Sequence, residues 1–203
     1  VFQVGIALVL ALLVDSVKRG SQVFRTLFFF PIVVSATALG LLFNLLLMTR
    51  GPINQIIENL GGEAIIFREQ FTFLTLAFPV IWQYVGFYFV LLVTGLNNIS
   101  EDIREAAAID GAGVLRTYFQ IILRNVLITC LTLSITGALK VFDMPWVMFP
   151  PYFSDAYLTG TYMYYQTFEK GNVDYAAAIA VFIVLLGVLL SQASKLIFRE
   201  KDY

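Results

Sequence analysis

The residues whose types and spacing could do chemistry gather between Glu101 and Arg124 of this 203-residue chain. Seven of these 24 residues are charged, and they stand between two long apolar stretches. Such a density of charge excludes a membrane span. The segment has no nucleophile paired with a base, so it is not a catalytic site. Its carboxylates, guanidinium groups and small side chains are suited to polar contacts with another protein. We therefore predict a docking element, with apolar residues recurring at helical spacing on one side at Ile99, Ile103, Ala106 and Ala107.

Two short helices must position these residues. Ser100 is a typical helix N-cap, and Glu101 and Asp102 then lie in the first turn, where the helix dipole favours negative charge. The sequence Asp110-Gly111-Ala112-Gly113 breaks this helix, with Gly111 supplying the bend. A second apolar set follows at Val114, Leu115, Tyr118, Phe119 and Ile122. The pattern predicts helix, turn, helix over residues 100–124.

The same segment carries a family resemblance. Glu105-Ala106-Ala107, then Asp110-Gly111-Ala112, then Ile121 and Leu123 closely resemble the EAA loop of binding-protein-dependent ABC importer permeases. In that family the loop is a cytoplasmic coupling helix that sits in a cleft of the ATP-hydrolysing subunit. The resemblance implies an ATPase-coupling role for Glu105, Ala106, Ala107, Asp110 and Gly111. Arg124 stands where the family usually has Pro, which predicts a straighter junction into the next helix.

Composition indicates a membrane protein independently of this motif. Hydrophobic residues make up 59% of the chain and charged residues 13%, against about 25% charged in soluble domains. About 20 apolar residues cross a bilayer. We predict an all-α polytopic membrane helix bundle, a single permease domain over residues 1–203, with the coupling loop 100–124 between its third and fourth spans. The five predicted spans are Val1 to Val14, Thr26 to Met48, Phe71 to Leu96, Asn125 to Phe142 and Tyr175 to Phe198.

Alternate loops differ in Lys and Arg, which predicts the orientation, because cytoplasmic loops carry the excess. One side holds nine basic residues and the other holds Arg50, Arg68 and Lys170, with Lys140 inside a span. We expect the coupling loop and the C-terminus to be cytoplasmic. The first span lacks an initiator Met and a basic flank, so we also expect an N-terminal truncation. The nine basic residues are Lys18, Arg19, Arg25, Arg104, Arg116, Arg124, Lys195, Arg199 and Lys201.

The usual constellations for metal, nucleotide or nucleophile chemistry are missing from the sequence. It has no His, no phosphate-binding loop ending in Gly-Lys-Ser/Thr and no Gly-x-Ser-x-Gly. Its one cysteine, Cys130, falls in a span and is expected to be a packing residue. We predict that the chain is not an enzyme, needs no cofactor or metal and binds no nucleic acid, and that its energy comes from a partner.

Further segments are similar to the carbohydrate-uptake (maltose/multiple-sugar) branch of the family. They are Arg25 to Pro31, Gly51-Pro52-Ile53-Asn54 and Lys140-Val141-Phe142-Asp143. The resemblance implies a permease of a prokaryotic cell membrane that imports a sugar or oligosaccharide by alternating access. It also implies a homologous second permease, two ATP-binding-cassette subunits and an extracytoplasmic solute-binding protein as partners, besides membrane lipid.

By alignment to the family, the third and fourth spans line the translocation path. The candidates there are Trp82, Gly86, Gly137, Lys140 and Asp143. Each has an alternative, since glycines also serve helix packing and aromatics form interfacial belts. Burying a lysine at the centre of a span costs roughly 2.5–3.5 kcal/mol, so Lys140 faces the path, snorkels to the interface or pairs with Asp143.

Two other functions stay open. A permease of the same superfamily could carry glycerol phosphate, an amino acid or a metal complex, because the EAA motif does not distinguish them. An ion-coupled secondary carrier is disfavoured, because it needs carboxylates within the membrane and the spans offer only Asp15 and Asp143, both near span ends.

Overall fold

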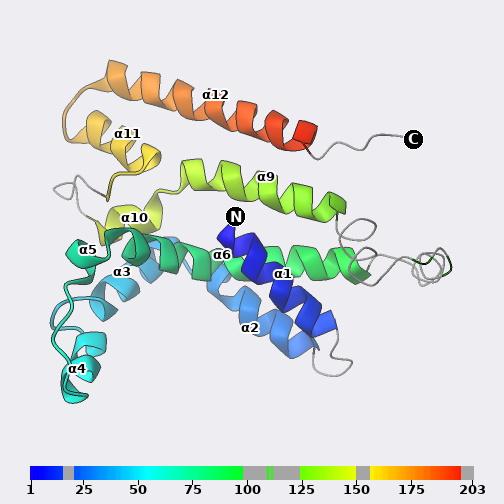
Figure 1. Cartoon of the computed structure of the whole chain (residues 1–203). Coiled ribbons are helices and arrows are strands. Elements are labelled where there is room, and N and C mark those ends of the chain that lie inside the picture. The colour runs from blue at the N-terminus through cyan, green and yellow to red at the C-terminus, as the bar shows by residue number, and fades with distance from the viewer. Residues whose placement is uncertain (16–20, 98–108, 110, 112–123, 150–155, 198–203) are drawn as a thin grey trace. The chain divides into compact units, whose positions relative to one another are not determined.

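The computed structural model describes residues 1–15, 21–97, 109, 111, 124–149 and 156–197 (Figure 1). Every regular element in these ranges is a helix, which confirms the all-α class. In the numbering of Figure 1 the helices are α1 (Phe2–Asp15), α2 (Ser21–Val33), α3 (Ala36–Leu46), α4 (Pro52–Asn59), α5 (Phe67–Gln70), α6 (Thr72–Asn97), α9 (Arg124–Lys140), α10 (Asp143–Met148), α11 (Thr159–Phe168) and α12 (Val173–Ile197).

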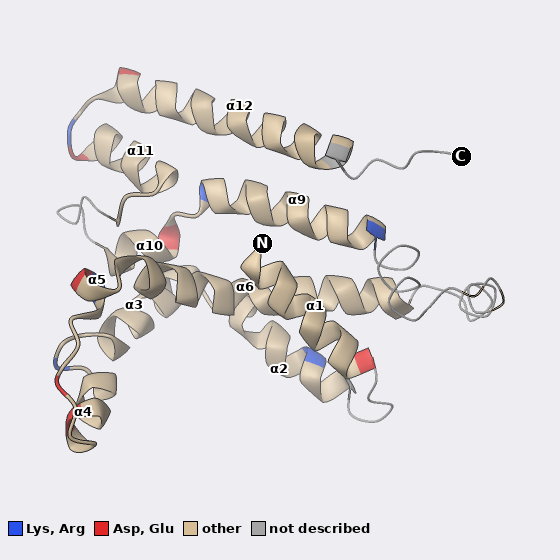
Figure 2. Cartoon of the chain, viewed as in Figure 1, with Lys and Arg blue, Asp and Glu red and all other residues tan. Residues whose placement is uncertain are grey.

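Three of the predicted spans are confirmed as helices long and apolar enough to cross a membrane. They are Thr72–Asn97 in α6, Arg124–Met148 in α9 with α10, and Val173–Ser194 in α12. Figure 2 shows α6, α9 and α12 almost free of charge along their lengths, with Arg124 and Lys140 at the two ends of α9 and Asp174 near the start of α12; Asp143 begins α10. Apolar middles with charged ends are what a hydrocarbon layer between two aqueous faces demands.

The predicted second span is not one straight helix. Between α2 and α3 the chain breaks at residues 34–35 and bends by 91°. Pro31 lies inside α2 and lacks an amide hydrogen, which weakens the end of that helix. Ser35 then starts a new helix, since the amide of Leu39 donates to the Ser35 carbonyl at 3.0 Å. The pair is a broken span or a re-entrant segment, a distinction that hydrophobicity alone does not make.

Helix α1 is apolar but short. Its 14 residues reach about 21 Å at 1.5 Å per residue, less than the ~30 Å of hydrocarbon. A crossing by residues 1–14 therefore stays a prediction.

The chain divides into two compact units. The first comprises residues 1–32, 84–136 and 189–203. Its core holds Phe89, Leu92 and Leu96 of α6 with Ala7 and Ala11 of α1, all fully buried. Cys130 is also fully buried and free, which confirms it as a packing residue. The Gln3 side-chain amide donates to Ser134 Oγ at 2.9 Å, which ties α1 to α9.

The second unit comprises residues 33–83 and 137–188. Helix α10 packs on α3 so closely that a Cβ on Gly40 would lie 3.2 Å from the Met144 carbonyl oxygen. Asn44 of α3 donates to the Val147 carbonyl at 3.4 Å and accepts a hydrogen bond from Arg68 of α5. Three short elements are thereby joined around an apolar cluster. The buried members of that cluster are Leu39, Phe43, Leu76, Met144, Met148, Phe149 and Ala156.

Asn54 of α4 stabilises the connection between α3 and α5 through side-chain hydrogen bonds. The side chain is fully buried, and its amide nitrogen donates to the carbonyls of Met48 at 3.1 Å and Ile65 at 2.9 Å. Its oxygen accepts from the Ile65 amide at 2.8 Å. A buried side-chain amide with three partners replaces the hydrogen bonds that an irregular backbone lacks. The asparagine of the Gly51-Pro52-Ile53-Asn54 motif therefore has a structural role.

Candidate functional site

Most of the predicted coupling loop lies outside the described residues, including Glu105, Ala106, Ala107 and Asp110. Gly111 is described and lies in a turn with φ of +72°, the left-handed region that side chains with a Cβ rarely adopt. A Cβ there would meet nothing within 4 Å. The neighbouring Ile109 is 85% exposed. The backbone at Gly111 thus needs glycine for its conformation, and the ATPase-coupling role of the five residues stays a prediction.

The five path candidates fall in both units. Gly86 belongs to the first unit, whereas Trp82, Gly137, Lys140 and Asp143 belong to the second. The structure therefore does not assemble the five into one site.

Gly86 is in close contact with the backbone of α2. A Cβ added to it would lie 1.6 Å from the carbonyl oxygen of Phe28, a distance that forces the backbones apart. One turn further along α6, the ring of Phe89 meets that of Phe28 edge-on, with centroids 5.3 Å apart. Helix packing, the alternative to a ligand space, accounts for this glycine.

Trp82 and Gly137 are more open. Trp82 is 39% exposed, and its ring packs edge-on against Phe43 with centroids 5.6 Å apart. Gly137 is exposed on α9, and a Cβ there would meet nothing within 4 Å. Within its own unit each of these positions could be reached by a solute or by a neighbouring helix.

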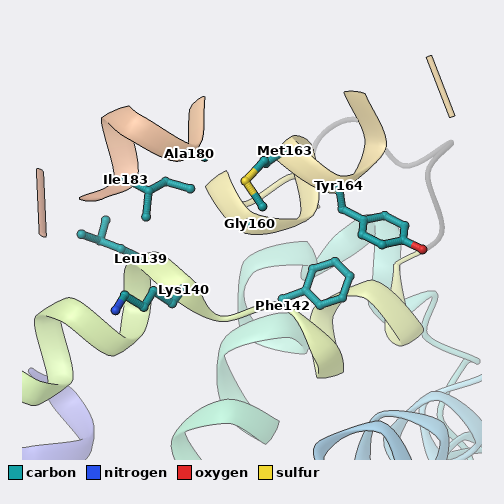
Figure 3. A pocket seen from close by; sticks show the side chains of 8 residues that line it. All are labelled: Leu139, Lys140, Phe142, Gly160, Met163, Tyr164, Ala180 and Ile183. Atoms are coloured by element: carbon teal, nitrogen blue, oxygen red, sulfur yellow. The ribbon is translucent and has the colours of Figure 1, made fainter. Parts of the chain in front are cut away.

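Lys140 lies beside a cavity of about 270 Å³ in the second unit. The end of α9 and the residues after it, the start of α11 and the N-terminal half of α12 form its walls (Figure 3). Its lining is mainly apolar, because Lys140 and Tyr164 are the only polar side chains among the described residues that line it. The lining residues are Leu139, Lys140, Phe142, Gly160, Met163, Tyr164, Ala180 and Ile183.

Lys140 and Asp143 do not pair with each other in the described part of the chain. Both side chains are exposed, and Asp143 stands in the first turn of α10, where the helix dipole favours a carboxylate. Figure 3 shows the Lys140 ammonium pointing away from the Phe142 ring. Of the alternatives for Lys140, pairing with Asp143 loses its support, and the interface and the path remain.

Sequence reasoning missed an aromatic cluster next to this cavity. Phe142 stacks on Trp146 with centroids 5.7 Å apart, and Tyr164 meets Trp146 at 4.7 Å and Phe168 at 4.5 Å. The spacing i, i+4 within Phe142 and Trp146, and again within Tyr164 and Phe168, was the available signal. The contact between the two pairs joins residues 18 or more apart, which local spacing does not reveal.

A second aromatic group lies outside the spans. The ring of Tyr157 is 5.2 Å from that of Tyr165 and 5.4 Å from that of Tyr162, and Lys170 Nζ lies 5.5 Å from the centre of the Tyr165 ring. Burial raises the pKa of the Tyr157 hydroxyl, and Tyr165 raises it further. Tyr157 therefore stays a neutral hydrogen-bond donor at physiological pH.

Among the described residues, no group of three or more His, Cys, Asp or Glu side chains could hold a metal ion.

Comparison with known proteins gives a family and a fold. The family described as "Binding-protein-dependent transport system inner membrane component" matches residues 3–201. Among solved structures, a bacterial ABC transporter involved in the import of the acidic polysaccharide alginate contains a chain with a TM-score of 0.81 and 19% identity. The match covers 98% of this chain and 73% of that one. At this identity the likeness shows a shared fold.

Several curated proteins are similar in sequence. The probable ABC transporter permease protein YurN of Bacillus subtilis is 29% identical, over 98% of this chain and 72% of its own length. The xylose/arabinose import permease protein XacH of Haloferax volcanii is 29% identical, over 90% of this chain and 60% of its own. The arabinooligosaccharides permease protein AraP of Halalkalibacterium halodurans is 27% identical, over 94% and 64%. The chain thus spans about 60 to 72% of the length of these relatives.

Proposed function

The chain belongs to the family of binding-protein-dependent transport system inner membrane components, and on that premise we propose that it is the permease subunit of an ATP-driven importer for a sugar or an oligosaccharide. The observation that carries the proposal is the family match over residues 3–201, together with three helices able to cross a membrane. A multi-span membrane location follows from the same observations.

The names of relatives support the sugar class. XacH is named for xylose and arabinose, AraP for arabinooligosaccharides, and the structural neighbour imports alginate. The same neighbour has also been crystallised in complex with a periplasmic protein bound to an alginate pentasaccharide. These names favour a saccharide over glycerol phosphate, an amino acid or a metal complex for the present chain.

The proposed mechanism is alternating access with partners. A second homologous permease completes the pathway, two ATP-binding-cassette subunits supply the energy, and a solute-binding protein delivers the sugar from outside. Glu105, Ala106, Ala107, Asp110 and Gly111 transmit the closure of the ATPases to the spans. The left-handed turn at Gly111 supports this proposal, because it gives the loop the sharp bend that a helix-turn-helix needs.

Within the proposed path, the second unit offers the better candidates. Trp82, Gly137 and Asp143 all lie there and are exposed. Gly86 is already used for packing against Phe28. We retain Trp82, Gly137 and Asp143 as residues that face the solute.

The proposal is tested by purifying the full-length protein with its co-expressed partner subunits and reconstituting the complex in liposomes. We expect ATP hydrolysis to rise when the solute-binding protein is loaded with one member of a sugar panel. A rise with glycerol phosphate, an amino acid or a metal complex instead would replace the sugar class and keep the importer. Uptake driven by a proton or sodium gradient without ATP would replace the importer by a secondary carrier.

A further inference from the structure

The cavity beside Lys140 lies between parts of the chain that belong to membrane-spanning helices. Leu139 and Lys140 end α9, and Ala180 and Ile183 lie in the span of α12. Met163 and Tyr164 of α11 also line the cavity, with the Met163 side chain nearer to these two helices than the Tyr164 ring (Figure 3). All of these residues belong to the second unit.

Direct contacts between the helices bound this cavity. One turn beyond Ile183, a Cβ on Gly187 would lie 4.0 Å from the Leu139 side chain, so α9 and α12 meet there. At the other side, Thr159 Oγ1 donates to the Leu139 carbonyl at 2.9 Å. A Cβ on Gly160 would lie 3.1 Å from the carbonyl oxygen of Val141. The start of α11 is thereby fixed to the end of α9, so specific contacts between the helices define the walls of the cavity.

Among the described residues that line the cavity, Lys140 is the one that carries a charge. Lys140 is exposed, and no Asp or Glu lines the cavity with it. Phe142, Trp146 and Tyr164 cluster beside it, and such aromatic side chains typically lie at the level of lipid headgroups. An apolar space between two spans, with one cation in its lining and an aromatic cluster next to it, matches the acyl chain and the charged headgroup of a phospholipid.

We propose that this cavity binds an anionic phospholipid, with part of an acyl chain against Leu139, Met163 and Ile183 and the headgroup phosphate on the Lys140 ammonium. Basic pockets between membrane helices bind such headgroups on the cytoplasmic side, and the proposal extends the same charge pairing to the outer face, where the predicted orientation places Lys140. The volume of about 270 Å³ is just below the range of small-molecule pockets, about 300–1,000 Å³, so the cavity holds a segment of the lipid. A sugar fits less well, because only Lys140 and Tyr164 could hydrogen-bond to its hydroxyls.

This inference goes beyond the proposed function and needs from it only that α9 and α12 lie in a membrane. The test uses the full-length protein in its purified complex, reconstituted in nanodiscs with equal amounts of phosphatidylglycerol and phosphatidylcholine. After exchange into detergent, the phospholipid retained per protein is quantified by mass spectrometry. We expect the wild type to retain phosphatidylglycerol in excess.

Two variants separate the headgroup from the acyl chain. Lys140→Gln should lower the enrichment of phosphatidylglycerol about fivefold, the effect of about one lysine near a membrane surface. Ala180→Leu should fill the cavity and lower the retention of both lipids. Lys170→Gln is the matched control, since Lys170 is exposed and lies over the Tyr165 ring away from the cavity lining. It should retain lipid as the wild type does.

Three results would overturn the proposal. The first is an unchanged enrichment in Lys140→Gln, measured in a complex whose melting temperature matches the wild type. The second is displacement of phosphatidylglycerol by millimolar inorganic phosphate, which would identify a free anion as the ligand. The third is a half-saturating sugar concentration that is higher in Lys140→Gln than in the wild type, with the same lipid retention in both. That result would show that Lys140 contacts the solute. The first two outcomes are read from lipid retention alone and do not depend on whether the complex transports sugar, so failure here is distinct from failure of the proposed function.

Discussion

Gly86 and Gly137 have the same side chain but different surroundings, and the difference bears on what each can do. Gly86 lets α6 approach the backbone of α2, whereas Gly137 stands open on α9. Sequence reasoning treated both as spaces for a ligand or as packing residues. Only the distances to neighbouring backbone atoms separate the two roles.

Alanine at each position gives a matched test. Gly86→Ala should destabilise the protein by about 1–3 kcal/mol, because its Cβ would lie 1.6 Å from the Phe28 carbonyl oxygen and the helices must separate. Gly137→Ala should be neutral or stabilise by up to about 1 kcal/mol, since alanine favours helix and nothing lies within 4 Å. Thermal unfolding of the purified complex in detergent measures both. Equal stability of the two variants would contradict the packing role of Gly86.

Gly111 permits a test of the coupling turn. Gly111→Val forces a β-branched residue to φ of +72°, at a cost of about 1–2 kcal/mol confined to the loop. We expect the chain to insert normally while sugar uptake falls more than basal ATP hydrolysis does. Gly61→Val is the control, because Gly61 has φ of +85° and equally open surroundings in another loop. Normal uptake and normal ATPase association in Gly111→Val would remove the docking assignment.

At the scale of elements, the connection between α3 and α5 depends on one side chain. Asn54 makes three hydrogen bonds, and no helix or strand ladder supplies them at residues 48 and 65. The loop therefore holds its shape through a buried amide. Loops of this kind are vulnerable to the loss of a single group.

Asn54→Ala should destabilise this connection by about 1–3 kcal/mol, the penalty for leaving buried backbone groups without partners. The first effect should be faster hydrogen exchange at the Ile65 amide, because that amide donates to Asn54 Oδ1 in the wild type and loses this acceptor in the variant. Asn59→Ala serves as the control, because Asn59 is exposed on α4. Similar exchange in both variants, measured by mass spectrometry of peptides from residues 60–70, would show that the loop does not depend on Asn54.

Spans α6, α9 and α12 were predictable because each is a long run of apolar residues whose ends are marked by charge. The break between α2 and α3 was not, since Pro31 is tolerated inside many membrane helices and a single serine, Ser35, does not interrupt an apolar run. The apolar cavity was also hidden, because its walls come from residues about 40 positions apart. Of the residues that line the cavity, only Lys140 was identified as a candidate from the sequence, because a charge within a span is energetically costly.

At the scale of the whole molecule, orientation connects the parts. The count of nine basic residues against three predicts that the coupling loop faces the cytoplasm and that the loops around Arg50, Arg68 and Lys170 face outward. Docking of an ATPase requires the same orientation. A single measurement of which side of the membrane each loop faces therefore tests both the charge count and the proposed docking of the ATPase.

Cysteines at Ile109 and Leu60 make that measurement, because these side chains are 85% and 83% exposed and belong to loops predicted on opposite faces. The native Cys130 is fully buried, so it should contribute little background. In intact cells, Leu60→Cys should react with a membrane-impermeant maleimide while Ile109→Cys reacts only after the membrane is opened. Labelling of Ile109→Cys in intact cells would reverse the orientation. A loop that faces outward cannot meet a cytoplasmic ATPase, so that result would also remove the proposed coupling role of Gly111 and its neighbours.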